Sequence, residues 1–253
     1  MGKCRLTTAA LVALALALAA CDDGDQRTPP PPAPTVGDPE AYFGVAPCTC
    51  LEYVSDDPQN LLKLGIAVEA KTDIYTQGHD QYIVRYRLNG QQSRVDFVDP
   101  TDPELRLNWV NLGSGDNDQY YELTDGLPFV TGPVEDQQTV QVSSAAINKV
   151  FGTAQGTETT ISMRADYAAQ TVEASLDGGA RQSMEATRIL YGGLPWGDQV
   201  RWFVPNVGFV KLELELGAGS GRVTWILNRV RTLEGGCPWR PGDPIPGEQI
   251  CGI

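Results

Sequence analysis

Residues 81–97 constrain the fold more than any other stretch, because apolar and polar side chains alternate along them on both sides of Asn89-Gly90. An Asn-Gly pair favours a two-residue type I′ turn, and alternation with a period of two is typical of antiparallel strands. The turn predicts a hairpin whose opposed residues are Leu88 and Gln91, Tyr86 and Ser93, Val84 and Val95, and Tyr82 and Phe97. One face of this hairpin is then largely apolar. The charged residues predicted for its other face are Arg85, Arg87, Arg94 and Asp96.

Strand patterns continue through residues 41–253, which are long enough to form one domain with a sizeable core. In residues 209–216, valine and leucine alternate with lysine and glutamate, so the charged face is predicted to meet water. The other predicted strands are residues 63–75, 105–109, 159–166, 171–176, 182–190, 199–204 and 222–230. Residues 113–134 are predicted to be irregular, and residues 144–150 to form a short helix. A meander of strands with one wet face predicts an all-β, antiparallel fold with minor α content.

The N-terminus has the pattern of an export signal. Lys3 and Arg5 precede 12 uncharged residues, Ala9 to Ala20, composed of Ala, Leu and Val. As a helix these would span about 18 Å, whereas the hydrocarbon core of a bilayer is about 30 Å thick. Residues 1–20 are therefore predicted to be a signal peptide rather than a membrane-spanning helix.

Leu18-Ala19-Ala20-Cys21 resembles the lipobox of bacterial lipoproteins. The resemblance implies cleavage before Cys21 and covalent attachment of lipid to this residue, with no other cofactor. Two or three acyl chains hold a protein on a bilayer, whereas one chain binds only reversibly. The expected location is the bacterial cell envelope, on the periplasmic face or the cell surface. A plain secretory signal cleaved after an Ala-x-Ala site is the alternative.

Residues 21–40 are predicted to be a linker that carries the lipid at its first residue. Prolines occupy positions 29 to 32, 34 and 39. Proline lacks a backbone donor and favours extended polyproline II, so this segment cannot join a core. At about 3.1 Å per residue it could hold the domain up to about 60 Å from the membrane.

Two short segments carry a second resemblance. Residues 42–47 (YFGVAP), followed by Leu51-Glu52-Tyr53, and residues 202–211 (WFVPNVGFVK) are similar to the "YFPLAPGNxWxY" and "WFAPGVGLVK" segments of many exported bacterial lipoproteins. Asn206 replaces a glycine of the second segment, and Cys48-Thr49 replaces the Gly-Asn turn of the first. The resemblance implies a single strongly curved antiparallel sheet, an open half-barrel related in shape to periplasmic lipoprotein carriers and receptors. It implies no activity.

Four cysteines remain once Cys4 is removed with the signal and Cys21 is lipidated: Cys48, Cys50, Cys237 and Cys251. An even number in an oxidising compartment predicts two disulfides, with three connectivities open. We favour two bridges from the Cys-x-Cys pair to the C-terminal segment, which would staple a tail rich in Pro and Gly to the first strand. A zinc site of four cysteines is the alternative, although the paired Cys-x-x-Cys spacing is absent.

Charge and motifs restrict the chemistry of the domain. A formal net charge of −13 excludes nucleic acid as a partner and indicates that lipid, not charge, makes the membrane contact. His79 is the only histidine, and no serine lies in a Gly-x-Ser-x-Gly motif. Asp116-Asn117-Asp118 with Glu122 lacks the central glycine of a calcium loop. No catalytic residue and no metal ligand is therefore predicted.

These observations predict a membrane-anchored, non-enzymatic binding or structural module whose partner is another envelope protein or an apolar ligand. The alternative is a lipid or lipoprotein receptor or carrier that uses the concave face of the sheet. Trp202 and Trp225 fit the alternation of apolar residues and are the candidate ligand contacts on that face, although core packing is the favoured explanation for both. An envelope hydrolase is the third alternative, which the single histidine disfavours.

Overall fold

A computed structural model describes residues 37–57, 59, 61–72, 81–101, 103–113, 119–132, 136–150, 156–215 and 221–232. The predicted signal peptide, Cys21 and nearly all of the predicted linker lie outside these residues. The described elements are α2 (Pro39–Phe43), β1 (Thr49–Ser55), β2 (Lys63–Thr72), β3 (Gln81–Leu88), β4 (Gln91–Pro100), β5 (Glu104–Leu112), β6 (Gln119–Thr131), β7 (Thr139–Val150), β8 (Thr157–Ala174), β9 (Gln182–Gly192), β10 (Gln199–Val204), β11 (Gly208–Leu214) and β12 (Val223–Thr232).

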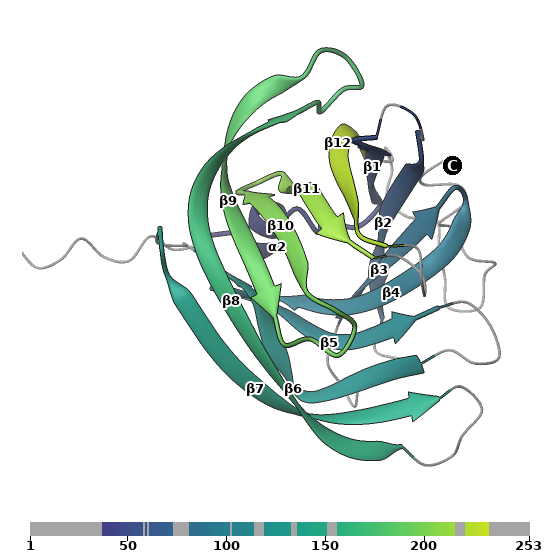
Figure 1. The fold of residues 1–253 in the computed structure, drawn as a ribbon, viewed down its shortest axis with the longest axis vertical. Helices are drawn as coiled ribbons and strands as arrows, with labels where there is room; N and C mark the ends of the chain where they lie inside the picture. The colour runs from purple at the N-terminus through teal and green to yellow at the C-terminus, as the bar shows by residue number, and fades with distance from the viewer. Residues whose placement is uncertain are drawn as a thin grey trace, which may run out of the picture. The chain divides into compact units, whose positions relative to one another are not determined.

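The strands form a closed antiparallel barrel in the order β1-β12-β11-β10-β9-β8-β7-β6-β5-β4-β3-β2 (Figure 1). The predicted all-β class is confirmed, whereas the predicted open half-barrel is wrong. The first and last strands pair with each other, from Thr49 opposite Thr232 to Ser55 opposite Trp225. Closure satisfies the backbone groups of two strands that would otherwise be sheet edges, which is the physical reason for preferring it.

The hairpin of β3 and β4 is confirmed, but its predicted register holds for only part of its length. Asn89 and Gly90 have φ of 48° and 83°, as a type I′ turn requires. Leu88 lies opposite Gln91 as predicted, but a β-bulge at Ser93 places Tyr86 opposite Arg94 instead of Ser93. Every later residue of β4 is displaced by one position, which exchanges the two faces of the strand.

Two other predictions in the middle of the chain are wrong. Residues 113–134 contain β6, whose pairing with β5 is interrupted by register shifts around Gly126 and Pro128. Residues 144–150, predicted to be a helix, continue β7, which pairs with β8 from Thr139 opposite Asp166 to Asn148 opposite Thr157. A ladder of this length outweighs the small differences in local propensity on which the helix prediction rested.

The hairpin of β8 and β9 extends beyond the barrel wall and folds against β12. β11 pairs only with residues 223–226 of β12. The tip of the β8–β9 hairpin bonds to β12 beyond these residues. The Ser175 amide donates to the Leu227 carbonyl over 3.0 Å, and the Val230 amide donates to the Leu176 carbonyl over 2.9 Å. Three side chains of this hairpin are buried although they lie near its tip: Val172, Ala174 and Ala186. The hairpin therefore covers part of the outer face of the barrel.

Helix α2 closes one end of the barrel. Asp38 caps its N-terminus by accepting from the Glu40 amide over 3.1 Å, and Gly44 ends it with a φ of 67°. The ring of Phe43 is buried, with its centroid 5.9 Å from that of Phe203. The Asn206 amide donates to the Tyr42 carbonyl over 2.8 Å. The two segments quoted above for their lipoprotein resemblance thus pack against each other.

Both residues that replace a glycine-bearing turn in these segments adopt the left-handed conformation, Cys48 with φ 66° and Asn206 with φ 64°. Asparagine visits this region routinely, whereas for cysteine it costs about 1–2 kcal/mol. Both turns thus use the left-handed conformation without a glycine at these positions.

Gly44 packs against a backbone, which gives a test of the end closure. A Cβ at Gly44 would lie 2.5 Å from the Val207 carbonyl oxygen and 2.7 Å from the Gly208 Cα. We expect Gly44→Ala to lower the free energy of unfolding by about 3 kcal/mol, from left-handed strain plus the clash. Urea unfolding followed by circular dichroism measures this.

Gly37→Ala is the matched control, because Gly37 has a φ of 73° and nothing lies within 4 Å of the position that a Cβ would take there. It should cost only the strain, about 1 kcal/mol. Equal losses in the two variants would contradict the packing of Gly44 on residues 207 and 208.

Candidate functional site

The β-bulge at Ser93 brings charge into the barrel. Beyond it, Arg94 and Asp96 share the inner face of β4, opposite Tyr86 and Val84 of β3. Both charged side chains are buried, with exposed fractions of 2% and 1%. The Arg94 Nε donates to the Asp96 carboxylate over 2.6 Å. Alternation in the sequence predicts this pair on the outer, wet face, and no residue near Ser93 signals the bulge.

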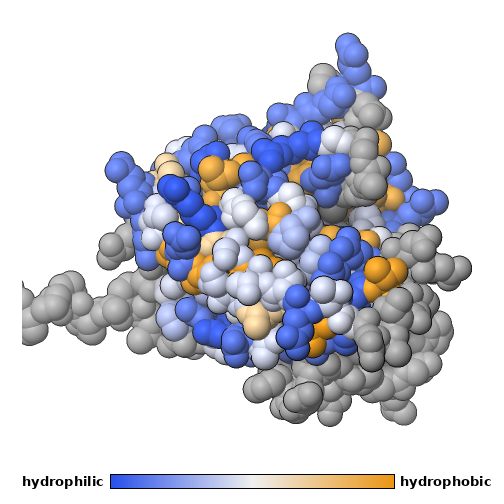
Figure 2. Space-filling view, turned by 60° about the horizontal axis from the view of Figure 1, so that its bottom comes forward, coloured by the Kyte–Doolittle hydropathy of each residue, from blue (hydrophilic) through white to orange (hydrophobic). Residues whose placement is uncertain are grey.

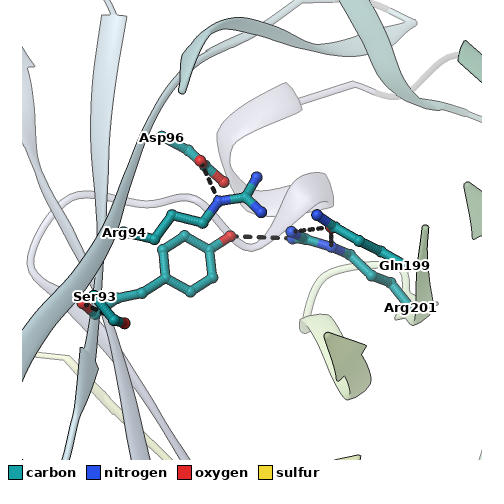
Figure 3. A network of polar contacts seen from close by, with 6 residues as sticks. Ser93, Arg94, Asp96, Gln199 and Arg201 are labelled. Atoms are coloured by element: carbon teal, nitrogen blue, oxygen red, sulfur yellow. Dashed lines mark hydrogen bonds and ion pairs between the residues drawn. The ribbon is translucent and has the colours of Figure 1, made fainter. Parts of the chain in front are cut away.

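A second buried cation, Arg201 of β10, lies near this pair (Figure 3). Its Nη1 donates to the Tyr86 hydroxyl over 3.1 Å, and its Nη2 donates to the Gln199 side-chain oxygen over 2.9 Å. Because β3 and β10 are not neighbours in the barrel wall, the bond to Tyr86 crosses the interior. We call Tyr86, Arg94, Asp96, Gln199 and Arg201 the interior charge cluster.

Aromatic rings surround the Arg201 guanidinium. Its carbon lies 4.6 Å from the centroid of Phe129, 5.0 Å from that of Phe209 and 5.9 Å from that of Tyr86. The electron-rich faces of these rings attract a cation, and the effect is larger where water is excluded. The rings and the neutral oxygens thus replace the water that the guanidinium loses on burial.

The ionisation states of the cluster follow from the same burial. Loss of water would lower the pKa of Arg201, but Tyr86, Asp96 and Tyr191 outweigh this and leave the pKa raised above its ordinary value. Burial raises the pKa of the Tyr86 hydroxyl, and it also raises those of Tyr53 and Tyr191. Arg201 is therefore charged and the three tyrosines are neutral throughout the physiological range.

Among the described residues, the space beside the cluster is small. A cavity of about 30 Å³ adjoins the cluster and is lined by Tyr86, Asp96, Arg201 and mainly apolar residues. This volume is about that of a single water molecule, so it cannot hold an acyl chain or a peptide. Tyr53 crosses the same region and donates from its hydroxyl to the Phe209 carbonyl over 2.6 Å.

The barrel end opposite α2 is also covered. The loop between β9 and β10 brings the ring of Trp196 to 5.4 Å from that of Tyr121 and 5.7 Å from the guanidinium of Arg94. Leu194 of the same loop is buried. Side chains at both ends thus separate the interior charge cluster from solvent.

A larger hollow lies on the surface at this end. Its volume is about 320 Å³, and its lining residues are Ser55, Asp56, Asp57, Leu62, Arg222, Val223 and Thr224. Arg222 is engaged with the Asp198 carbonyl at 2.8 Å, and the Asp57 carboxylate accepts from the Gln59 amide at 2.9 Å. These contacts engage Arg222 and Asp57 in the surrounding loops.

The structure separates the two tryptophans that the sequence grouped as candidate ligand contacts. Trp202 and Trp225 are 3% and 1% exposed and both belong to the main core, and neither lines the interior cavity. The Trp202 Nε1 donates to the Gln170 side chain of β8 over 2.8 Å, which places this ring under the β8–β9 hairpin. Trp225 lies opposite Leu212, a core residue of β11.

Alternation alone could not assign these faces. In β10 it groups Trp202 with Val200 and Val204, away from Arg201, and so assigns Arg201 to solvent. The β8–β9 hairpin buries the outer face of β10 as well, and residues 199–203 are buried on both sides. Arg201 is the charged residue of this buried strand, and only the covering hairpin shows that it cannot face solvent.

The remaining predicted sites are only partly described. Cys48 and Cys50 are buried at the start of β1, at 1% and 0% exposed. Cys21, His79, Cys237, Cys251 and residues 116–118 lie outside the described residues. Glu122 forms an ion pair with Lys149 at 3.1 Å rather than standing free as a metal ligand.

Two further features are absent from the described part of the chain. Within it, no group of three or more His, Cys, Asp or Glu is placed to hold a metal ion. No helix there has the length and apolar character that crossing a bilayer requires. In comparisons with known proteins, no family model matches the chain, and neither a curated protein nor a solved structure matches it.

The buried tyrosines predict how the barrel responds to alkali. Below about pH 10 they are protonated in both the folded and the unfolded chain. Above it the unfolded chain releases phenolic protons that the folded chain retains, so the free energy of unfolding falls as the pH rises past about 10. Absorbance at 295 nm should show Tyr53, Tyr86 and Tyr191 ionising only as circular dichroism reports unfolding.

Tyr86→Phe should remove one tyrosine from this late step and leave the earlier ionisation unchanged. Complete ionisation of all tyrosines near pH 10 with a native spectrum would contradict the burial of their hydroxyl groups.

Proposed function

We propose that this protein is a lipid-anchored bacterial cell-envelope lipoprotein whose barrel is a non-enzymatic binding or structural module. Cys21 carries the lipid, residues 22–40 form the tether, and the barrel acts through its outer surface on another envelope protein.

The observation that carries the proposal is the filled interior. Core side chains from all twelve strands pack together within the closed wall, and among the described residues the cavity beside the interior charge cluster measures about 30 Å³. Polar and apolar residues are interspersed on the face shown in Figure 2, as is usual for a surface that meets water. Of the described residues, the well-exposed large hydrophobic side chains are Leu61 and Val150.

A lipid or lipoprotein carrier is less well supported. It was predicted to use the concave face of an open sheet, and closure of the barrel removes that face. A binding cleft for a ligand of that size needs a volume of several hundred Å³. An envelope hydrolase has no support in the interior charge cluster either, because Asp96 is paired with Arg94 and both barrel ends are covered.

The cysteines support an extracytoplasmic location. Cys48 and Cys50 are buried at the start of β1, and we propose that both form disulfides. We propose Cys237 and Cys251 as their partners, which peptide mapping without reduction would check. Disulfides persist in the periplasm or outside the cell and are rare in the cytosol.

The anchor is tested by Cys21→Ser, expressed in a bacterium that processes lipoproteins. Because lipid attachment needs the thiol, we expect the protein to move from the membrane fraction to the soluble fraction of the envelope. Cys4→Ser is the control, since it changes a cysteine before the cleavage site and should leave the protein in the membrane. Continued membrane fractionation of the Cys21 variant would rule out the anchor.

The choice between a filled module and a carrier is tested by native mass spectrometry of the full chain, purified from its own envelope in mild detergent. We expect the mass of the lipidated chain without any further small ligand. A lipid or peptide of defined mass that stays bound would instead support the carrier, and would show that the interior opens.

A further inference from the structure

Strand β7 is paired on both sides only at residues 146–148. Residues 146–150 pair with residues 119–123 of β6, and residues 139–148 pair with β8. Residues 139–145 therefore have β8 on one side, and among the described residues no strand pairs with their other side. We call this unpaired side of residues 139–145 the β7 edge.

The gap is part of the fold, because β6 makes other contacts where it leaves β7. Beyond Leu123, β6 follows β5 to the end that α2 covers. There the Phe129 carbonyl accepts from the Tyr191 hydroxyl over 2.7 Å, and the two rings stack with centroids 4.5 Å apart. The Tyr191 hydroxyl of β9 thus bonds to a β6 carbonyl that could otherwise have bonded to a neighbouring strand. The β7 edge cannot close onto β6 without breaking this contact.

Within the described residues, the β7 edge has none of the usual protection of an edge strand. Natural edges carry lysine, proline or a bulge that blocks pairing with another chain. From Thr139 to Asn148 the sequence TVQVSSAAIN has no charged residue, no proline and no glycine. The pairing with β8 runs through it without a register shift. Along its outer face the side chains of Gln141, Ser143 and Ala145 are exposed.

We propose that the β7 edge is the contact of a homodimer, in which residues 139–145 of two copies pair as antiparallel strands. The dyad passes through Val142, the central residue. The opposed residues are then Thr139 and Ala145 of the second copy, Val140 and Ser144, Gln141 and Ser143, and Val142 with itself. The two β7–β8 hairpins thereby join into one continuous sheet.

A second copy fits this edge for reasons of charge and symmetry. The chain carries a formal net charge of −13, so most self-contacts would bring like charges together. The proposed pairing opposes only neutral residues, and the small Ser and Ala side chains face the larger Gln, Val and Thr. A two-fold contact uses the same segment twice, which requires a self-complementary segment of this kind.

The test replaces two exposed residues whose side chains would face each other across the dyad. In Gln141→Glu/Ser143→Glu, two pairs of like charges oppose each other in the dimer. In Gln141→Glu/Ser143→Lys, the same two positions form opposite-charge pairs. Within one copy Gln141 lies opposite Arg164 and Ser143 opposite Ser162, so neither variant opposes like charges in the monomer.

Native mass spectrometry of the full lipid-anchored chain in mild detergent, over a concentration series, measures the dimer dissociation constant. We expect dimers of the wild type, a dissociation constant raised about tenfold or more in the Glu/Glu variant, and recovery in the Glu/Lys variant. Gln91→Glu/Gln182→Glu adds the same charge at exposed positions of β4 and β9 and should leave the constant unchanged. Thermal unfolding should show that all variants fold alike.

Three results would overturn the proposal. The wild type could remain monomeric at every concentration, the Glu/Glu variant could dimerise as well as the wild type, or the Glu/Lys variant could fail to recover. A photo-crosslinking residue at position 143 that captures a different envelope protein, and not a second copy, would also overturn it and assign the β7 edge to that partner.

Discussion

The pairing of β1 with β12 is the constraint on which the rest of the structure depends. It closes twelve strands into a wall without end strands, and the lumen of a barrel widens as the number of strands grows. Such a lumen must be filled, because an empty apolar space loses dispersion contacts on every side. Large aromatic rings and long arginine side chains fill the lumen, among them Tyr53, Phe129, Tyr191 and Arg201. Helix α2 and the Trp196 loop cover the two ends.

The interior charge cluster shows how this filling tolerates charge. An isolated buried guanidinium would cost several kcal/mol in lost hydration. Arg201 offsets the loss through hydrogen bonds to Tyr86 and Gln199 and through the faces of nearby rings. Arg94 offsets the loss through its ion pair with Asp96, and the bulge at Ser93 places both side chains on the inner face of β4. The cluster therefore fixes the placement of β10 relative to β3 and β4, which lie across the interior from it.

These features support the proposed interaction on the outside of the barrel. An interior filled by its own side chains agrees better with the proposed module than with a carrier that must admit a ligand. The outer wall differs from strand to strand, since the β8–β9 hairpin covers β10 whereas the β7 edge is left without a neighbour. Lateral pairing at that edge is compatible with the proposed tether, because two anchored copies share one membrane plane.

The sequence by itself determined the predominance of strands, the type I′ turn at Asn89-Gly90 and the alternation of β11, because each depends on neighbouring residues. Only the tertiary structure decided that the sheet closes, since closure depends on the pairing of Thr49–Ser55 with residues some 180 positions later. It also decided which face of β4 is buried, because one inserted residue at Ser93 reverses every side chain after it. The interior site could not be predicted for the same reason: Arg94, Asp96 and Arg201 read as surface residues until both faces of their strands are covered.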